Sequence, residues 1–357
     1  MSPQPASAPD TPVGTAPIET GALEDWMDGQ DLPGGAITGL RPIGGGTQNI
    51  MVRFERGGVS YVLRRGPRHL RPNTTTVITR EMTLLSALSG TTVPHPRFVA
   101  GTDDESVLGA VFYLMEPVDG FNAAENLDAP AAATAEGRTR MGYGLVDALA
   151  ELGAVDHTRI GLGDFGRPEG FLQRQVPRWL AEFDRYRGTA GYPGPEFGEL
   201  DRVADWLERY RPTDSRPGIL HGDYHIANVM YRYDSPVVAA IVDWEMATIG
   251  DPLLDLGVLS AIWPTEPGGA ELYESALGAT GDLPRRAAMI DRYAAASERD
   301  LSALDWYTVL ACFKLGIILE GTYARSCAGK APRAVGERLR RYANGLFDRA
   351  DRVIAGE

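Results

Sequence analysis

The chain has 357 residues, of which 43% are hydrophobic and 23% are charged, the composition of a globular protein with room for two lobes or domains. Its net charge of −13 argues against nucleic acid as a partner, because a phosphate backbone requires a basic face. No apolar run reaches the length of a membrane span, so we expect no membrane partner either.

Residues 1–17 are rich in Pro, Ala, Ser and Thr and lack the basic and apolar regions of a signal peptide, so we predict a disordered tail over residues 1–18. The two cysteines, Cys312 and Cys327, fit neither a disulfide framework nor a metal motif. Such cysteines are typical of buried thiols in a reducing compartment, and we therefore predict a cytoplasmic protein.

Residues 19–117 predict a small, nucleotide-binding first lobe. A short amphipathic helix over residues 20–30 precedes three apolar, alternating segments, and Gly57 and Gly58 indicate a hairpin turn between the second and third. A segment with helical periodicity follows and is closed by Gly90. Two more strands come after it, giving five antiparallel strands with one inserted helix. The predicted strands cover residues 36–43, 49–54, 60–64, 97–100 and 110–115, and the inserted helix covers residues 75–88.

This first lobe contains candidate residues for binding nucleotide phosphates. Residues 44–49 join the first two strands as a glycine hairpin whose backbone N–H groups would contact phosphates, although a plain turn explains the same glycines. Arg64 ends the third strand, where a kinase needs a cation, and Glu81 on the following helix would brace it. A surface Arg and a solvated Glu are the alternative. No Walker A motif is present, which excludes a P-loop fold. The candidates in the hairpin are Gly45, Gly46, Thr47 and Asn49.

After Pro117 the pattern changes to long helical segments, which predict a helical, catalytic and substrate-binding second lobe over residues 118–357. We expect a nucleotide to lie at the seam near residues 115–120, because ligands favour the seam between lobes. The predicted helices cover residues 131–154, 170–187, 197–210, 251–262, 284–296, 301–325 and 333–354.

The most informative stretch is His-Gly-Asp-Tyr-His-Ile-Ala-Asn at residues 221–228, followed by Val-Asp-Trp-Glu at residues 242–245. In a kinase-type site an Asp accepts the proton of the attacking hydroxyl. An Asn five residues later and an Asp beyond the next strand hold the magnesium ions. Asp223, Asn228 and Asp243 stand at these spacings. The apolar run over residues 237–242 predicts a buried strand that delivers Asp243 to the same cleft as Asn228.

Other interpretations of this stretch remain open. Asp and Asn are common in turns, and an Asp after a strand often only caps the next helix. His221, Asp223 and His225 alternate like ligands on one strand face, which would indicate a metal-dependent hydrolase, although no second cluster of His and Asp has ligand spacing. Between Asp223 and Asp255 there are six acids and one base, so this segment needs cations, either magnesium or a positively charged substrate.

With these residues established, the chain resembles the aminoglycoside phosphotransferase and choline kinase superfamily from roughly residue 40 to residue 325. It is most similar to a bacterial subgroup related to the kinase-like domains found beside acyl-CoA dehydrogenases, in which an Arg at the position of Arg64 is familiar. The resemblance implies an α+β, protein-kinase-like fold with two lobes. The segments that carry the closer resemblance are YVLRRGP at 61–67, RE at 80–81, GLGDFGRP at 161–168, Arg174 and Gln175 with Trp179, FKL at 313–315 and GTYAR at 321–325.

The resemblance also implies roles for individual residues. Asp223 is expected to be the catalytic base, with Asn228 and Asp243 as magnesium ligands. Met115 and Glu116 are expected to form the hinge that binds adenine through backbone groups.

For the neighbouring residues the resemblance leaves more than one role. His225 stands where protein kinases keep a phosphate-contacting Lys, so it would touch the transferred phosphate unless it orients the hydroxyl or is structural. His221 is expected to brace the loop by hydrogen bonding. Glu245 is either a further metal ligand or a polar neighbour, whereas Asp251 and Asp255 are expected to cap or tether the following helix. Packing, rather than substrate contact, is expected of Trp179, Tyr323 and Arg325.

These observations predict a cytoplasmic phosphotransferase that uses ATP and magnesium to phosphorylate a hydroxyl group of a small molecule. The superfamily suggests an aminoglycoside as the acceptor, which would make the protein an antibiotic-resistance enzyme. The closer subgroup suggests a hydroxyacyl thioester or a hydroxy acid. The alternatives are a nucleotide-binding pseudokinase scaffold and the metal-dependent hydrolase.

Overall fold

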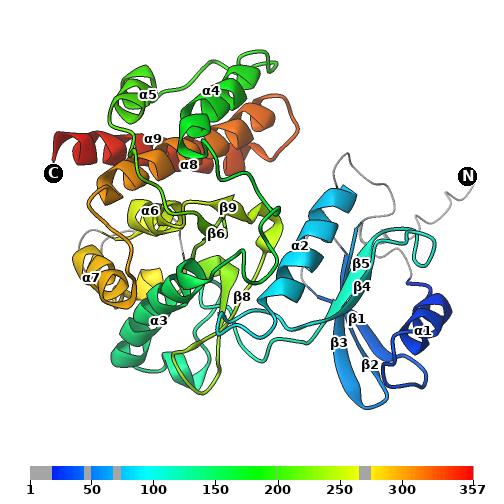
Figure 1. Ribbon diagram of the computed structural model, residues 1–357. Coiled ribbons are helices and arrows are strands. Elements are labelled where there is room, and N and C mark those ends of the chain that lie inside the picture. Colours follow the sequence, from blue (N-terminus) through cyan, green and yellow to red (C-terminus); the bar gives the residue numbers. More distant parts are fainter. Residues whose placement is uncertain (1–17, 44–49, 67–73, 199, 265–274, 357) are drawn as a thin grey trace, which may run out of the picture. The chain divides into compact units, whose positions relative to one another are not determined.

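The computed structural model describes residues 18–43, 50–66, 74–198, 200–264 and 275–356 (Figure 1). These residues fall into two compact units, one within Met1–Ser89 and Pro96–Pro117 and the other within Gly90–His95 and Val118–Glu357. Two groups of predictions lie outside the described residues. They are the tail over residues 1–17 and the glycine hairpin with Gly45, Gly46, Thr47 and Asn49.

The first unit is built on a five-stranded antiparallel sheet in the order β1-β2-β3-β5-β4 (Figure 1). The five strands and the helix inserted after the third confirm the sequence prediction, with small shifts at the ends. Gly57 and Gly58 both have positive φ, which lets them form the tight turn between β2 and β3. The elements are α1 (Thr20–Asp28), β1 (Thr38–Pro42), β2 (Ile50–Arg56), β3 (Val59–Arg65), α2 (Thr74–Leu88), β4 (Phe98–Thr102) and β5 (Phe112–Met115).

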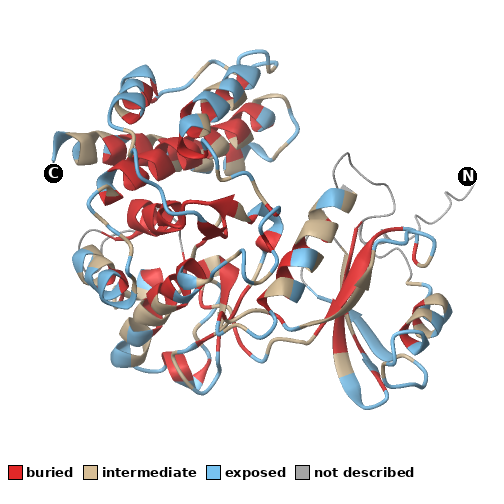
Figure 2. Ribbon diagram, viewed as in Figure 1, coloured by how far each residue is buried: buried red, intermediate tan, exposed pale blue. Residues whose placement is uncertain are grey.

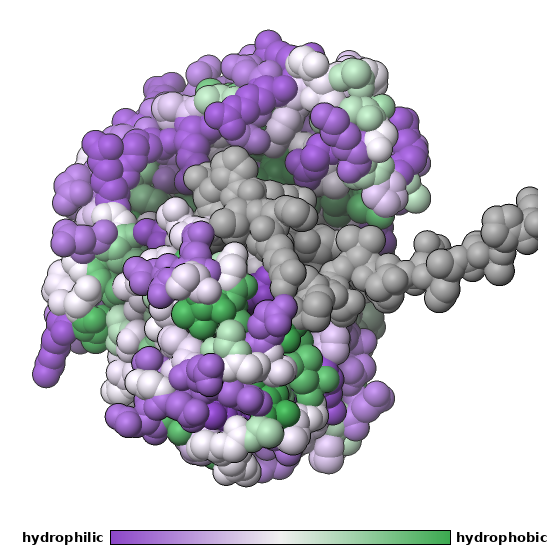
Figure 3. All heavy atoms as spheres, turned by 90° about the vertical axis from the view of Figure 1, so that its right-hand side faces the viewer, coloured by the Kyte–Doolittle hydropathy of each residue, from purple (hydrophilic) through white to green (hydrophobic). Residues whose placement is uncertain are grey.

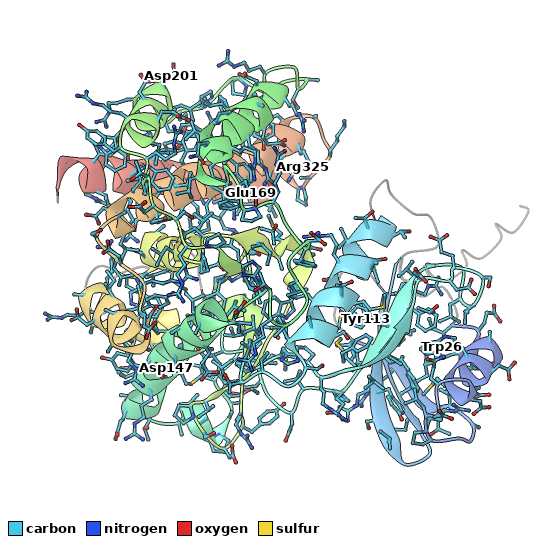
Figure 4. All side chains as sticks on the ribbon, in the orientation of Figure 1. Trp26, Tyr113, Asp147, Glu169, Asp201 and Arg325 are labelled. Carbon is cyan, nitrogen blue, oxygen red and sulfur yellow. The ribbon has the colours of Figure 1, made fainter. Side chains whose placement is uncertain are left out.

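Helix α1 covers one face of this sheet through an apolar cluster. Leu23 and Met27 of α1 are fully buried and belong to the same cluster as Leu63 of β3. Trp26 of α1, labelled in Figure 4, meets the ring of Phe112 edge-on, with 4.8 Å between the ring centroids. Because side chains alternate along a strand, the residue after Leu63 points to the opposite face, where α2 packs.

The second unit is mainly helical, as predicted, and holds two small two-stranded sheets, β6-β9 and β7-β8. Every predicted helix of this region is present, and β8 is the predicted buried strand. Strands β6, β7 and β9 escaped prediction because three residues are too few to show an alternating pattern. The elements are α3 (Ala135–Ala154), α4 (Gln175–Tyr186), α5 (Leu200–Arg209), β6 (Gly218–Leu220), β7 (Val229–Tyr231), β8 (Val238–Ile241), β9 (Thr248–Gly250), α6 (Leu253–Ile262), α7 (Arg286–Ala296), α8 (Leu304–Cys327) and α9 (Arg333–Ala355).

The start of α3 corrects the sequence prediction by four residues. Thr134 caps the helix by accepting a hydrogen bond from the Gly137 N–H at 3.0 Å, and residues 130–132 form a separate 3-10 turn. A Thr cap satisfies one of the N–H groups that a helix leaves free at its start. Helices α4, α5, α6, α7 and α8 also begin two to five residues later than predicted, because helix ends are the least predictable part of a pattern.

Helix α6 forms the centre of the second unit. All ten of its residues are buried, and they are apolar apart from Asp255 and Ser260, as expected of a helix enclosed on every side (Figure 2). The long helices α8 and α9 pack against each other and α8 also packs against α6 (Figure 1). Gly257 makes the α6–α8 approach possible, because a Cβ atom there would lie 2.5 Å from the Tyr307 carbonyl oxygen.

Among the described residues, no helix combines the length and the apolar character that crossing a bilayer requires. On the face drawn in Figure 3, hydrophilic side chains predominate among the described residues, with apolar side chains in small groups between them. The large apolar residues that are exposed come from several elements. They are Leu40, Ile43, Val59, Tyr210, Tyr233, Val237 and Met246.

We expect Gly257→Ala to lower the free energy of unfolding by about 1–3 kcal/mol, because the added methyl group meets the rigid backbone of α8. Urea titration of purified protein measures this change. Gly188→Ala is the matched control, since a Cβ at Gly188 would have no atom within 4 Å. If both variants unfold at the wild-type urea concentration, the close approach of the two helices is not needed.

Candidate active site

The loop over residues 221–228 and the segment over residues 242–245 meet at one end of the β7-β8 hairpin. The loop connects β6 to β7, and the segment follows β8 directly. In the hairpin Val229 lies opposite Ile241, and the Val242 N–H donates to the Asn228 carbonyl oxygen at 2.9 Å. The backbone of Asn228 therefore lies beside the residue that precedes Asp243.

Asp223, His225 and Asn228 form a cluster within this loop. The Asn228 amide nitrogen donates to the Asp223 carboxylate at 3.0 Å and to the Asp223 carbonyl oxygen at 2.8 Å. The His225 Nε2 atom lies 3.4 Å from the same carboxylate. The Ala227 N–H donates to His225 Nδ1 at 3.2 Å, so a neutral His225 carries its proton on Nε2, towards Asp223.

The environment keeps Asp223 ionised. Burial raises the pKa of its carboxyl, but the hydrogen bond and charge of His225 and the charge of Lys314 outweigh burial, and the net pKa lies below the ordinary value. The carboxylate nevertheless remains accessible, with 38% of the side chain exposed. An accessible carboxylate that is charged at neutral pH can accept a hydrogen bond from an incoming hydroxyl.

His221 braces the loop, as expected. It is fully buried, its Nε2 lies 3.0 Å from the Val242 carbonyl oxygen, and its Nδ1 accepts from the Asp223 N–H at 3.3 Å. Burial lowers the pKa of His221 to about 4, so the ring is neutral at physiological pH. Its side chain also packs on Trp244, with 4.8 Å between the ring centroids.

The alternative ligand set of His221, Asp223 and His225 is not assembled. Both ring nitrogens of His221 are engaged with backbone groups, which leaves no lone pair for a metal ion. In the part of the chain that the structure describes, no group of three or more His, Cys, Asp and Glu residues is arranged to hold a metal ion. The arrangement therefore does not support the metal-dependent hydrolase.

Asp255 anchors the start of the loop, a role that the sequence prediction missed. Its carboxylate accepts from the His221 N–H at 2.6 Å and from the Gly222 N–H at 2.9 Å. Burial raises the pKa of Asp255 to about 6, against the charge of Lys314 and the two N–H groups. Asp251 tethers the start of α6, because its carboxylate accepts from the Leu253 N–H at 3.0 Å. Spacing alone could not separate these two roles.

Two backbone conformations in the site are unusual. Gly222 has a φ of +86°, and a Cβ atom there would lie 2.6 Å from the Met246 carbonyl oxygen, so only glycine fits. Asp243 has a φ of +63° and a ψ of +64°, in the left-handed region that residues other than glycine rarely enter. Strain of this kind is concentrated at functional sites. Asp243 is exposed, so its carboxylate is accessible to a ligand.

The first unit contains the predicted ion pair between β3 and α2. The Arg64 Nη2 atom lies 2.6 Å from the Glu81 Oε1 atom, and both side chains are almost completely buried. The strand register explains the contact, because Arg64 points to the face opposite Leu63, where α2 packs. The alternative of a surface Arg with a solvated Glu is wrong.

Of the predicted hinge residues, Met115 ends β5 and Glu116 follows it. Met115 is buried and lies opposite Val62 and Phe98 in the sheet. The Glu116 N–H donates to the Arg97 carbonyl oxygen at 2.9 Å, and its carboxylate pairs with the Arg97 guanidinium. Because the Glu116 N–H is already bonded to Arg97, an adenine ring would need other backbone groups of this segment.

Of the three residues expected to pack, Trp179 and Tyr323 are buried, whereas Arg325 is exposed and donates to the Thr322 hydroxyl at 2.7 Å. Glu245 lies on the exposed side of a short 3-10 turn that follows Asp243.

One further residue that contacts the loop was not predicted to have a role. It is Lys314 of α8, whose ammonium group donates to the Gly222 carbonyl oxygen at 2.5 Å.

The sequence is similar to known proteins over most of its length. The model of the "Phosphotransferase enzyme family" matches residues 39–305. Acyl-CoA dehydrogenase family member 11 of Gallus gallus is 30% identical over 308 residues, which cover 84% of this chain and 38% of that protein. The protein of the same name from Rattus norvegicus is 30% identical over 322 residues, 86% of this chain and 40% of that protein. The chain thus spans about two fifths of the length of these relatives.

Among solved structures, a "putative aminoglycoside phosphotransferase" from Ralstonia eutropha has a TM-score of 0.77 and 29% identity, and the match covers 94% of this chain and 99% of that one. A thermostable mutant of the aminoglycoside phosphotransferase APH(4)-Ia, in ternary complex with ADP and hygromycin B, has a TM-score of 0.57 and 13% identity. That match covers 91% of this chain and 98% of the other, and at this identity it shows the fold alone. The α+β, protein-kinase-like fold class is confirmed.

We expect the stabilities of wild type and His221→Asn to converge as the pH falls from 6.5 to 4. The buried His221 has a pKa of about 4, below its ordinary value of 6.5, so the contribution of the neutral ring is complete above pH 6.5 and is lost on acidification. The difference in unfolding free energy should shrink by about 2–3 kcal/mol over this range, measured by urea titration at each pH.

His157→Asn, which removes a His outside the loop, is the control for this measurement. Titration of Asp255 acts in both proteins and therefore cancels in the difference. A gap between wild type and His221→Asn that stays constant from pH 6.5 to 4 would mean that His221 is not held neutral.

Proposed function

The chain belongs to the phosphotransferase enzyme family, and we propose that it is a small-molecule kinase that transfers the γ-phosphate of ATP to an acceptor hydroxyl with the help of magnesium. The observation that carries the proposal is the cluster of Asp223, His225 and Asn228, beside the segment that bears Asp243. Phosphoryl transfer requires little covalent chemistry from the protein, and these residues supply positioning and charge.

Asp223 is the proposed catalytic base. Its ionised, accessible carboxylate would hold the acceptor hydroxyl in line with the phosphate and accept its proton as the new bond forms. The Asn228 amide orients this carboxylate by donating one hydrogen bond to it and another to the Asp223 backbone carbonyl oxygen. His225, with its Nε2 proton directed at Asp223, would orient the same hydroxyl or contact the transferred phosphate.

The chemistry of the donors fits magnesium, which prefers oxygen ligands and neutralises the phosphate charge when bound. Asp243 offers an accessible carboxylate. The Asn228 nitrogen is directed at Asp223, which leaves the amide oxygen for a cation. We therefore assign Asn228 and Asp243 as the ligands. Glu245, on the exposed side of the adjoining turn, is a candidate further ligand.

In the first unit, Arg64 is the proposed cation for the nucleotide phosphates and Glu81 is its brace. The planar guanidinium can bond two oxygens at once, so Arg in place of the usual Lys keeps the charge and changes the geometry. Gly45, Gly46, Thr47 and Asn49 remain candidate phosphate contacts, and Met115 and Glu116 remain the candidate adenine contacts.

The acceptor class has two candidates. The solved relative from Ralstonia eutropha, by its name, suggests an aminoglycoside, whereas the relatives named acyl-CoA dehydrogenases suggest a hydroxyacyl thioester or a hydroxy acid. A pseudokinase scaffold is disfavoured, because Asp223, Asn228 and Asp243 are all present and the first two are hydrogen bonded. Both cysteines are free thiols, which is the reason for proposing a cytoplasmic location.

We expect Asp223→Ala to fold and to bind ATP but to lose at least about a hundredfold in turnover, because the base is removed while the nucleotide contacts remain. The assay is ADP release with magnesium-ATP across a panel of aminoglycosides, 4-hydroxyacyl thioesters and free hydroxy acids. Asp223→Asn, which keeps the shape of the side chain, should be similarly impaired.

Stimulation of ADP release by one acceptor class identifies the substrate. Wild-type turnover in Asp223→Ala would refute Asp223 as the base. If no acceptor in the panel stimulates ADP release by the wild type, although the protein still binds ATP, the pseudokinase scaffold would be favoured.

We expect Asp243→Ala to abolish the magnesium dependence of nucleotide binding, measured by calorimetric titration of ATP with and without magnesium. Asp234→Ala is the matched control, because Asp234 is an exposed Asp on the segment that connects β7 and β8. The control should keep the wild-type response to magnesium. A response that survives in Asp243→Ala would remove Asp243 from the ligand set.

A further inference from the structure

Lys314 is unusual because lysine is rare in this chain and because its side chain is buried. Only two of the 35 Lys and Arg residues in the chain are Lys, and the other one, Lys330, is exposed. Lys314 is buried in α8, with 4% of its surface exposed. A buried ammonium group is costly unless charges or hydrogen bonds compensate it, so a Lys at this position needs a reason.

Lys314 and Asp255 hold the same short stretch of backbone from two elements. Asp255 of α6 accepts from the His221 and Gly222 N–H groups at 2.6 and 2.9 Å. Lys314 of α8 donates to the Gly222 carbonyl oxygen at 2.5 Å. This carbonyl belongs to the peptide that joins Gly222 to Asp223, so the backbone is held on both sides of Gly222.

The surroundings leave this stretch little freedom to move. The Met246 carbonyl oxygen lies against Gly222, at the place where a side chain would begin. The ring of Trp179 lies under the ammonium group, with 6.0 Å from Nζ to the ring centroid. The Gly222 carbonyl oxygen is the hydrogen-bond acceptor of the ammonium group.

The energetic balance of Lys314 is therefore unlike that of an ordinary stabilising Lys. Burial lowers its pKa, and the nearby charges of Asp255 and Asp223 act against this effect. Removing one charge from a group of buried, interacting charges leaves the others uncompensated, so the loss of Lys314 also removes a charge that offsets the burial of Asp255. The contact of the ammonium group with the Gly222 carbonyl oxygen is a separate effect, because it acts on the backbone that leads to Asp223.

We infer that Lys314 is a positioning residue for the proposed phosphotransfer, because its ammonium group fixes the Gly222–Asp223 peptide and thereby the direction of the Asp223 carboxylate. The inference rests on the proposed role of Asp223 as base. A compact ammonium group suits a single carbonyl acceptor in a confined site, whereas the planar fork of Arg is suited to two acceptors. A displacement of about 1 Å in such a loop is enough to cost about a hundredfold in rate.

The test compares Lys314→Met, which keeps the length of the side chain and removes the charge, with Lys330→Met as the matched control. In Lys314→Met we expect kcat to fall about 10–100-fold while KM for ATP stays within about threefold of wild type. Hydrogen exchange of the amides in residues 219–226 should become at least about tenfold faster. Lys330→Met should match wild type in all three measurements.

The exchange measurement needs no acceptor substrate, so it separates the two proposals. If wild type phosphorylates none of the acceptors but exchange accelerates in Lys314→Met, the proposed function fails. The result still supports the inference that Lys314 holds the Gly222–Asp223 peptide. If folded Lys314→Met keeps wild-type kcat and wild-type exchange, the positioning role is overturned. A fall in thermal stability with kcat and exchange unchanged would also overturn it, because Lys314 would then be merely structural.

Should Lys314→Met fail to fold, Lys314→Ala with added ethylammonium replaces it. The amine fits the volume left by the side chain and restores the ammonium group. Recovery of amide protection and kcat with ethylammonium, and not with the same concentration of sodium, supports the positioning role. No response to the amine overturns it.

Discussion

The buried carboxylate of Asp255 is the interaction on which the candidate site depends. It accepts hydrogen bonds from two backbone N–H groups, those of His221 and Gly222, just before Asp223. The helix that carries it, α6, is enclosed on every side, so the carboxylate cannot move without disturbing the core of the second unit. Burial makes the charge costly and raises its pKa to about 6, while the N–H groups and Lys314 offset that cost. The loop is thus attached to the most rigid helix of the unit.

The rest of the site is arranged around this anchor by short-range constraints. In the β7-β8 hairpin the Val242 N–H donates to the Asn228 carbonyl oxygen. The neutral ring of His221 links the loop to the carbonyl oxygen of the same residue, Val242. These contacts hold Asp243 in a left-handed conformation that would be unfavourable in isolation. Backbone strain here is compensated by packing elsewhere in the unit, and the product is a preorganised group of oxygen and nitrogen atoms at the hairpin end.

In the first unit, the alternation of side chains along a strand decides which residues enter the core and which face α2. Alternation along β3 sends Leu63 into the cluster under α1 and sends Arg64 to the other face, against Glu81 of α2. One strand therefore supplies both a core residue and a buried cation. The hairpin at Gly57 and Gly58 sets the register that decides which side chain goes to which face.

The sequence by itself determined the elements and the chemical inventory of the site. Period-two and helical patterns placed the five strands and the helices, and the spacing of Asp223, Asn228 and Asp243 indicated phosphotransfer before any geometry was available. Local patterns contain this information because it depends on neighbours a few residues apart. Only the tertiary structure showed that Asp255 and Lys314 hold the loop, because they meet it across 33 and 92 residues of sequence. It also decided that His221 is a brace rather than a ligand, since the Val242 carbonyl and the Asp223 N–H occupy its ring nitrogens only once the chain has folded.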